Sequence, residues 1–253
     1  MSESNLQQAG IIEPAPGLSQ IQRITNTFIA PTKTFEDIRD RSRSWWLPFL
    51  ISIFFAYVFF AVITVKVGWP QVVDNIMQQD AKTQDRLAQA PPEARQQAIN
   101  ITLIMTEIAA WGSPVFAIVI ALLAALVLWG TINFVFGGKA KFWHIICVWM
   151  YAALPGLIKV WAGTIMLFIT PPDMFNLKNF APTNLGAFLP LDANKFLMVL
   201  ATKLDATDIW GMVVLSIGLA IVAGVKRNAG YITVFGWWFV LLLFALAGAA
   251  FSG

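Results

Sequence analysis

The stretch Pro114–Phe136 reads PVFAIVIALLAALVLWGTINFVF and contains no charged residue. A helix rises about 1.5 Å per residue, so a run of this length crosses a hydrocarbon core roughly 30 Å thick. Inside lipid no water completes the hydrogen bonds of the backbone, and a helix satisfies them within its own segment. The stretch therefore predicts a transmembrane helix.

Four further apolar runs of similar length lie on either side, at Trp45–Val65, Trp143–Ile169, Ile209–Val225 and Tyr231–Ala250. The composition agrees with them, because the chain is 58% hydrophobic and 12% charged and has a mean hydropathy of +0.68. Soluble domains carry about twice that share of charged residues, roughly 25%. The sequence therefore predicts an all-α, polytopic membrane protein whose bundle of five transmembrane helices occupies residues 45–253.

Basic residues are concentrated on one side of the predicted spans. They are Arg23, Lys33, Arg39, Arg41 and Arg43 before the first span, Lys139 and Lys141 between the second and third, and Lys226 and Arg227 between the fourth and fifth. Positive charge next to spans stays on the cytoplasmic side, so we expect the N-terminus inside and Gly253 outside. Because the net charge of +3 is sorted by side of the membrane, it does not indicate nucleic-acid binding.

The residues ahead of the first span divide into two parts. Residues 1–17, in which Ser, Glu, Gln, Pro and Gly are prominent, are expected to be disordered. Residues 18–44 place apolar side chains at helical spacing, with a break at Pro31. After the break, Thr34 is a candidate helix cap, and Asp37 three residues later completes a weak capping box.

The second of these short helices is predicted to lie on the membrane surface. We expect Phe35 and Ile38 to face the membrane. Three basic residues would then reach the lipid headgroups: Arg39, Arg41 and Arg43. The segment is therefore a candidate cytoplasmic contact with membrane lipids or with a protein partner, and a solvated linker is the alternative interpretation.

Small residues recur at four-residue spacing in the fourth run, at Ser216, Ala220 and Gly224. Such rows let helix backbones approach closely, because packing drives helix association in lipid. We expect this row to be a helix-packing face, while the abundance of alanine in apolar helices is the alternative explanation. A homo-oligomer, in which copies of the chain pack together, is a further possibility.

Lys159 is the one strong charge inside a predicted span, and ionisable residues at that depth by default indicate function. Pro155, one turn earlier, lacks an N–H and is expected to break the helix. Asn133 adds a polar group to the second run, so that these residues could line a solute path. The alternative is that Lys159 is an interfacial anchor paired with Asp208, and that Asn133 holds helices together.

The sequence offers no recognisable catalytic or metal-binding set. It has one histidine, His144, and one cysteine, Cys147, without the spacings typical of metal ligands or of activated nucleophiles. We therefore expect no catalytic, cofactor-binding or metal-binding residues and no enzymatic activity.

Several short motifs follow one another along the chain. They are Ile29-Ala30-Pro31-Thr32-Lys33-Thr34-Phe35, Trp46-Leu47-Pro48, Gly137-Gly138-Lys139-Ala140-Lys141-Phe142, Tyr151-Ala152-Ala153-Leu154-Pro155, Leu204-Asp205 and Ile209-Trp210. In this order and spacing, the chain from about Leu18 onward resembles the bacterial branch of the Yip family. These are five-span proteins whose eukaryotic members interact with Rab-type GTPases. The acidic, glycine-proline-containing signature and the Gly-Tyr-Glu-Tyr-Pro-like motif of those members are not evident here.

The resemblance implies an N-inside, C-outside five-helix fold in the bacterial inner membrane and no established reaction. Our preferred interpretation is a non-enzymatic membrane-organising or partner-binding scaffold. The alternative is a small transporter or channel that uses the polar groups of the second and third spans.

Overall fold

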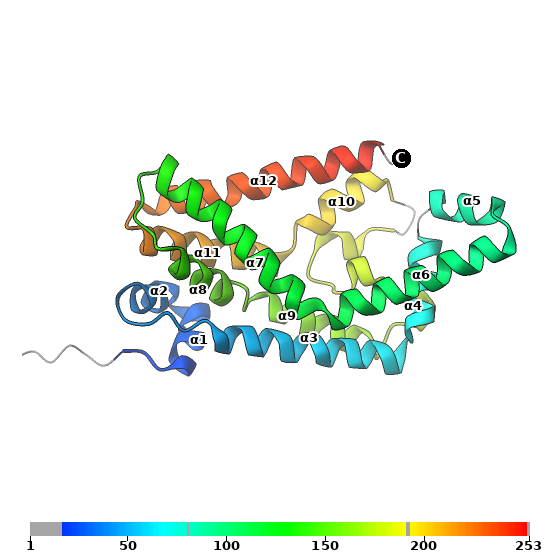
Figure 1. The fold of residues 1–253 in the computed structure, drawn as a ribbon, viewed down its shortest axis with the longest axis horizontal. Helices are drawn as coiled ribbons and strands as arrows, with labels where there is room; N and C mark the ends of the chain where they lie inside the picture. The colour runs from blue at the N-terminus through cyan, green and yellow to red at the C-terminus, as the bar shows by residue number, and fades with distance from the viewer. Residues whose placement is uncertain (1–16, 80, 191–192, 252–253) are drawn as a thin grey trace, which may run out of the picture.

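The computed structural model describes residues 17–79, 81–190 and 193–251, which fold almost entirely into helices (Figure 1). Five of these helical segments are long and apolar enough to cross a membrane. They are α3 (Trp46–Lys66), α7 (Ser113–Gly130) continued by the π-helical η2 (Thr131–Val135), α8 (Phe142–Ala152) followed by α9 (Gly156–Met166), α11 (Ala206–Ala223) and α12 (Arg227–Phe251). The predicted all-α, five-span architecture is confirmed. The predicted disordered tail, residues 1–17, lies outside the described residues apart from Gly17.

The third and fourth spans form the centre of the bundle. Half of the residues in each are buried, against 17% to 22% in the other three spans. The outer spans, α3, α7 and α12, therefore leave most of their residues partly or fully exposed, as helices at the lipid boundary do.

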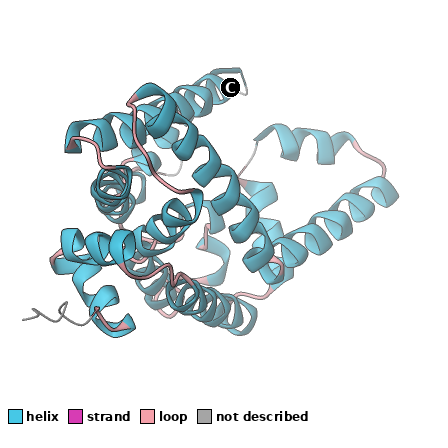
Figure 2. Ribbon diagram, turned by 60° about the vertical axis from the view of Figure 1, so that its left-hand side comes forward, coloured by secondary structure: helices cyan, strands magenta, loops and turns pink. Residues whose placement is uncertain are grey.

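The shorter helices lie towards the two ends of the bundle. They are α1 (Gln20–Ile29) and α2 (Pro31–Asp40) at one end, and α4 (Trp69–Gln78), α5 (Ala81–Gln89) and α6 (Pro92–Trp111) at the other. We call the first the basic end, because the connections at residues 137–141 and 224–227 also lie there. Figure 2 shows α5 and α6 as a bent arm that extends sideways from the bundle.

The connection between the third and fourth spans folds back against the bundle. It contains three short 3-10 turns and one helix, namely η3 (Pro172–Met174), η4 (Leu177–Asn179), η5 (Leu185–Phe188) and α10 (Lys195–Lys203). Figure 1 shows α10 beside the C-terminal half of α12, and the two helices are in contact. This connection is therefore part of the membrane domain and not a projecting loop.

The third span is interrupted where the sequence predicts it. Helix α8 ends at Ala152 and α9 begins at Gly156, with Pro155 buried between them. Proline has no N–H for the preceding turn and its ring collides with that turn, which explains the break.

Helices α1 and α2 form a hairpin that packs into the bundle, contrary to one prediction. Phe35 and Ile38 are fully buried, and a Cβ atom at Gly218 of α11 would lie 2.9 Å from the Phe35 ring. The expectation that these two side chains face the membrane is therefore wrong, because α11 covers them. Thr34 is not a cap, since α2 begins at Pro31, whose fixed φ and missing N–H suit the first position of a helix.

Candidate functional site

The Lys159 ammonium group is held between two carboxylates. Its Nζ lies 3.1 Å from Asp205 Oδ2 and 3.0 Å from Asp208 Oδ2. Asp205 is fully buried, whereas 49% of the Asp208 side chain is exposed. The predicted pairing with Asp208 is confirmed, and Asp205 is a second partner that sequence reasoning missed.

Asp205 is the most highly coordinated member of this cluster. Its Oδ1 accepts hydrogen bonds from two backbone N–H groups, that of Thr207 at 2.9 Å and that of Asp208 at 3.2 Å, and these bonds cap the start of α11. The same oxygen also accepts from Thr207 Oγ1 at 2.7 Å. Its Oδ2 accepts from Thr183 Oγ1 at 2.6 Å. Burial alone would raise the pKa of Asp205, but these hydrogen bonds and the Lys159 ammonium outweigh burial and lower its pKa to about 2.

The cluster joins three separate parts of the chain. Lys159 belongs to α9, Asp205 precedes α11, and Thr183 lies ahead of η5. The backbone reinforces the junction, because Ala206 N–H donates to the Thr183 carbonyl at 3.0 Å. The arrangement is suited to fixing the connection between the third and fourth spans, and the Lys159 side chain is held by protein groups instead of extending along the outside of the bundle.

Asn133 lies near the basic end, away from Lys159. Its Nδ2 donates to the Ala140 carbonyl at 3.0 Å and its Oδ1 accepts from Ala140 N–H at 2.9 Å. Trp129 Nε1 donates to the same carbonyl at 3.0 Å. Ala140 precedes α8 whereas Lys159 lies in α9, so the two polar residues lie towards opposite ends of the third span. Asn133 and Lys159 therefore do not form the polar pair that could have lined a solute path, and Asn133 instead holds the connection before α8.

The small-residue row of α11 meets α12 at a residue outside the predicted set. A Cβ atom at Gly230 would overlap the carbonyl oxygen of Ser216 and lie 3.1 Å from Ala220 Cβ. Ser216 and Ala220 therefore lie at a close backbone approach between the two helices. Gly224 does not take part, because it ends α11 in the left-handed conformation, with a φ of 68°. Sequence reasoning missed Gly230, which comes just before the predicted start of the fifth span.

A buried ion pair holds the N-terminal hairpin together. Arg23 Nε lies 2.6 Å from Asp37 Oδ2, and 8% and 6% of the two side chains are exposed. Leu18 closes the junction, because its carbonyl accepts from Arg23 Nη2 at 2.8 Å and its N–H donates to Asp37 Oδ1 at 3.0 Å. Tyr151 of α8 donates to Gln20 Oε1 at 3.0 Å and ties α1 to the third span. Asp37 is thus an ion-pair partner and not the capping residue that was expected.

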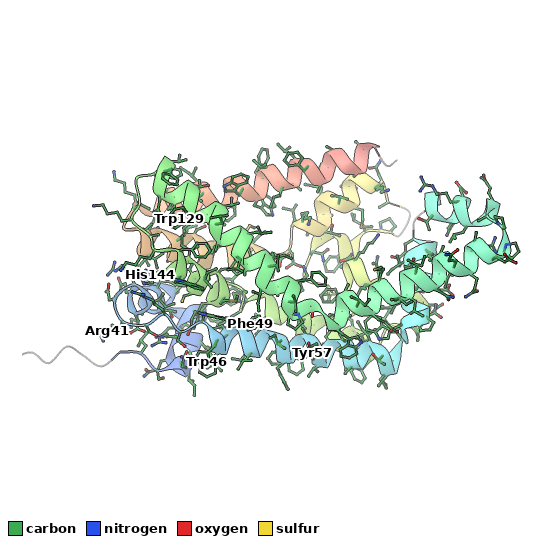
Figure 3. All side chains as sticks on the ribbon, in the orientation of Figure 1. Arg41, Trp46, Phe49, Tyr57, Trp129 and His144 are labelled. Atoms are coloured by element: carbon green, nitrogen blue, oxygen red, sulfur yellow. The ribbon has the colours of Figure 1, made fainter. Side chains whose placement is uncertain are left out.

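The predicted headgroup-binding residues Arg39, Arg41 and Arg43 lie in and after the last turn of α2. Figure 3 shows Arg41 at the same end of the molecule as His144. A cavity of about 440 Å³ at this end is lined by Arg39, Gly137, Lys139, Lys141, His144, Val222, Ala223 and Gly224. Of the three predicted residues Arg39 lines this cavity, together with Lys139 and Lys141, whereas Arg41 and Arg43 do not. The sequence places all these basic residues on one side of the membrane but does not show which of them share a cavity.

Comparison with known proteins identifies the family. The sequence profile described as the Yip1 domain matches residues 25–249, which takes in the second half of α1, α2 and the five spans except the last two residues of α12. No curated protein and no solved structure is significantly similar to the chain. Members of this family are generally non-enzymatic membrane proteins. The chain, a multi-pass membrane protein, therefore belongs to the Yip1 domain family.

Proposed function

We propose that this chain is a non-enzymatic scaffold of the bacterial branch of the Yip family, which holds a helical hairpin at the cytoplasmic surface of the inner membrane for a protein partner. One observation carries the proposal: the hairpin is packed into the bundle on one face and leaves apolar side chains uncovered on the other. Such a hairpin is a preformed binding surface.

The buried and exposed faces of the hairpin are clearly separated. Phe35 and Ile38 of α2 are fully buried against the bundle. On α1, Ile21, Thr25 and Ile29 follow one another at four-residue spacing and are exposed, with 74% of Ile21 and 75% of Ile29 accessible. Amphipathic helices use apolar residues at this spacing to bind a groove on a partner. Because the helix is already held in place, little conformational entropy would be lost on binding.

Charge sorting supports the cytoplasmic placement of the hairpin. The basic end carries Lys139 and Lys141 in one short connection and Lys226 and Arg227 in the other. Lysine and arginine in short loops remain on the cytoplasmic side during insertion. The same basic residues would contact the headgroups of membrane lipids.

A photo-crosslinking amino acid at position 25, between Ile21 and Ile29, tests the proposal in native membranes. We expect a discrete protein adduct that the double substitution Ile21→Glu and Ile29→Glu abolishes. The matched control is Ile101→Glu with Ile104→Glu, which changes two half-exposed isoleucines of α6 at the opposite end. Crosslinks to lipid alone, or an adduct that survives the Ile21 and Ile29 changes, would contradict the proposal.

The transporter interpretation is less well supported by the geometry. It drew on Asn133 and Lys159 as parts of one path, yet Asn133 holds Ala140 and Lys159 holds two carboxylates. Both polar groups have partners within the protein, which is the arrangement expected of structural residues.

A further inference from the structure

We infer that the cavity at the basic end binds a phosphate group, carried either by the headgroup of an anionic phospholipid or by free phosphate. The inference narrows the headgroup contact proposed above to one cavity, and it does not depend on the proposed protein partner, which would bind α1. Three features of the cavity support it: its charge, a buried imidazole, and the start of a helix.

The charge of the cavity lining is positive. Arg39, Lys139 and Lys141 line it, and no carboxylate of the residues that the structure describes does. Among the described residues, neither lysine forms an ion pair. Their ammonium groups are thus available to a ligand, and ammonium and guanidinium groups are the side chains that recognise phosphate.

Arg39 already has an acidic neighbour, Asp40. The guanidinium donates two hydrogen bonds to the Asp40 carboxylate, at 2.7 Å and 2.9 Å. The pair is exposed on both sides, with 43% and 53% of the side chains accessible. Exposed pairs contribute only about 0–1 kcal/mol, so a doubly charged ligand can compete for Arg39.

His144 provides a polar group at the base of the cavity. The residue is 7% exposed and lines the cavity, and its ring nitrogens form no hydrogen bond to the residues that the structure describes. Neither nitrogen is sealed off from solvent, so the imidazole N–H is free to donate a hydrogen bond into the cavity. A phosphate oxygen in the cavity would accept that hydrogen bond.

Helix α8 begins at the cavity wall, where Lys141 is its N-cap residue. No side chain caps this helix end. In this first turn the backbone N–H of His144 donates to the Lys141 carbonyl at 3.0 Å, which leaves the N–H groups of Phe142 and Trp143. Such free N–H groups carry partial positive charge, which raises the electrostatic potential near the cavity wall. The loop before the helix is held in place, because Lys139 N–H donates to the Ala223 carbonyl at 3.0 Å.

The place and size of the cavity favour a headgroup as the source of the phosphate. Trp143, next to His144, is 52% exposed, and exposed tryptophans at span ends are typical of the membrane interface. The cavity of about 440 Å³ falls within the range of small-molecule sites, about 300–1,000 Å³. It has room for more than a single phosphate group.

Binding is tested on the full-length protein in uncharged detergent, with three probes: short-chain phosphatidylglycerol, short-chain phosphatidylcholine and inorganic phosphate. Tryptophan fluorescence and the midpoint of thermal unfolding both report binding. The test variant is Lys139→Gln with Lys141→Gln. The matched control is Lys33→Gln with Lys226→Gln, which removes two exposed charges from the basic end without touching the cavity lining.

We expect saturable binding of phosphatidylglycerol, a dissociation constant raised about 30-fold in the cavity variant, and a change below about threefold in the control. Binding of inorganic phosphate with equal affinity would also support the site and would identify free phosphate as its ligand. Should the double variant fail to fold, the exposed Arg39→Gln change provides the same test and should weaken binding about fivefold. Equal losses in the cavity and control variants, equal binding of phosphatidylcholine, or no saturable binding of any probe would overturn the inference.

Discussion

Substitution of Lys159 by methionine is the most informative test of the charge cluster formed by Lys159, Asp205 and Asp208. The change leaves the carboxylate of Asp205 fully buried, with only its hydrogen-bond donors as partners. Removing one member of a buried ion pair costs about 3–5 kcal/mol of unfolding free energy. Because Thr183 and Thr207 still donate to Asp205, we expect the lower value, about 3 kcal/mol.

Two matched variants make the measurement specific. Asp208→Asn removes a carboxylate that is also within 3.0 Å of Lys159 Nζ but is half exposed, so we expect a loss of only about 0–1 kcal/mol. The double change Lys159→Met with Asp205→Asn removes both buried charges, so it should be less damaging than the sum of the single changes. We expect a coupling free energy of about 1–3 kcal/mol.

The free energy of unfolding would be measured by equilibrium denaturation in mixed detergent micelles. If Lys159→Met were as mild as Asp208→Asn, or if the coupling with Asp205 were close to zero, the buried pair would not stabilise the fold and our reasoning would be refuted.

Three further predictions concern helix packing, hairpin docking and pH. Gly230→Ala should lower the unfolding midpoint because its Cβ would overlap α11, whereas Gly236→Ala, in the same helix with open space around it, should change it little. Phe35→Ala should cost about 3–5 kcal/mol of unfolding free energy, while the exposed Ile21→Ala should stay within about 0.5 kcal/mol, as measured by denaturation. The pKa of Asp205 is lowered from 3.8 to about 2, so its stabilisation is fully present above pH 4 and is lost as the pH falls to about 2. Stability measured across this range should therefore converge for the wild type and Asp205→Asn at the acidic end, and a constant difference would contradict the assignment.

The five spans could be predicted from the sequence because length and hydropathy alone define them. Each predicted boundary lies within four residues of the observed one. The break at Pro155 could also be predicted, since the missing N–H of proline acts locally. These features depend on neighbouring residues along the chain and need no knowledge of how the helices pack.

The environment of Phe35 and Ile38 could not be predicted in the same way. Spacing shows that one face of α2 is apolar, but lipid and the interior of a bundle are equally apolar, so the pattern does not say which of them covers it. Gly218 was the one hint in the sequence that α2 packs on α11, because a glycine in the middle of an apolar helix marks a site of close packing.

Partners far apart in the sequence were missed for a related reason. Lys159 is separated from Asp205 by the whole connection that folds back on α12, and Arg23 pairs with Asp37 across the turn between α1 and α2. In both cases the charged residues are visible in the sequence, whereas their pairing is set by the tertiary arrangement.

Hydrogen exchange of the full-length protein in lipid nanodiscs tests the central claim most directly, namely that α1 and α2 are an integral, rigid part of the membrane domain. The account predicts that the amides of α2 around Phe35 and Ile38 exchange as slowly as those of α11, against which they pack. Complete exchange of the α1–α2 hairpin at the earliest time points, while α11 remains protected, would show that the hairpin only rests on the membrane surface and would contradict the account.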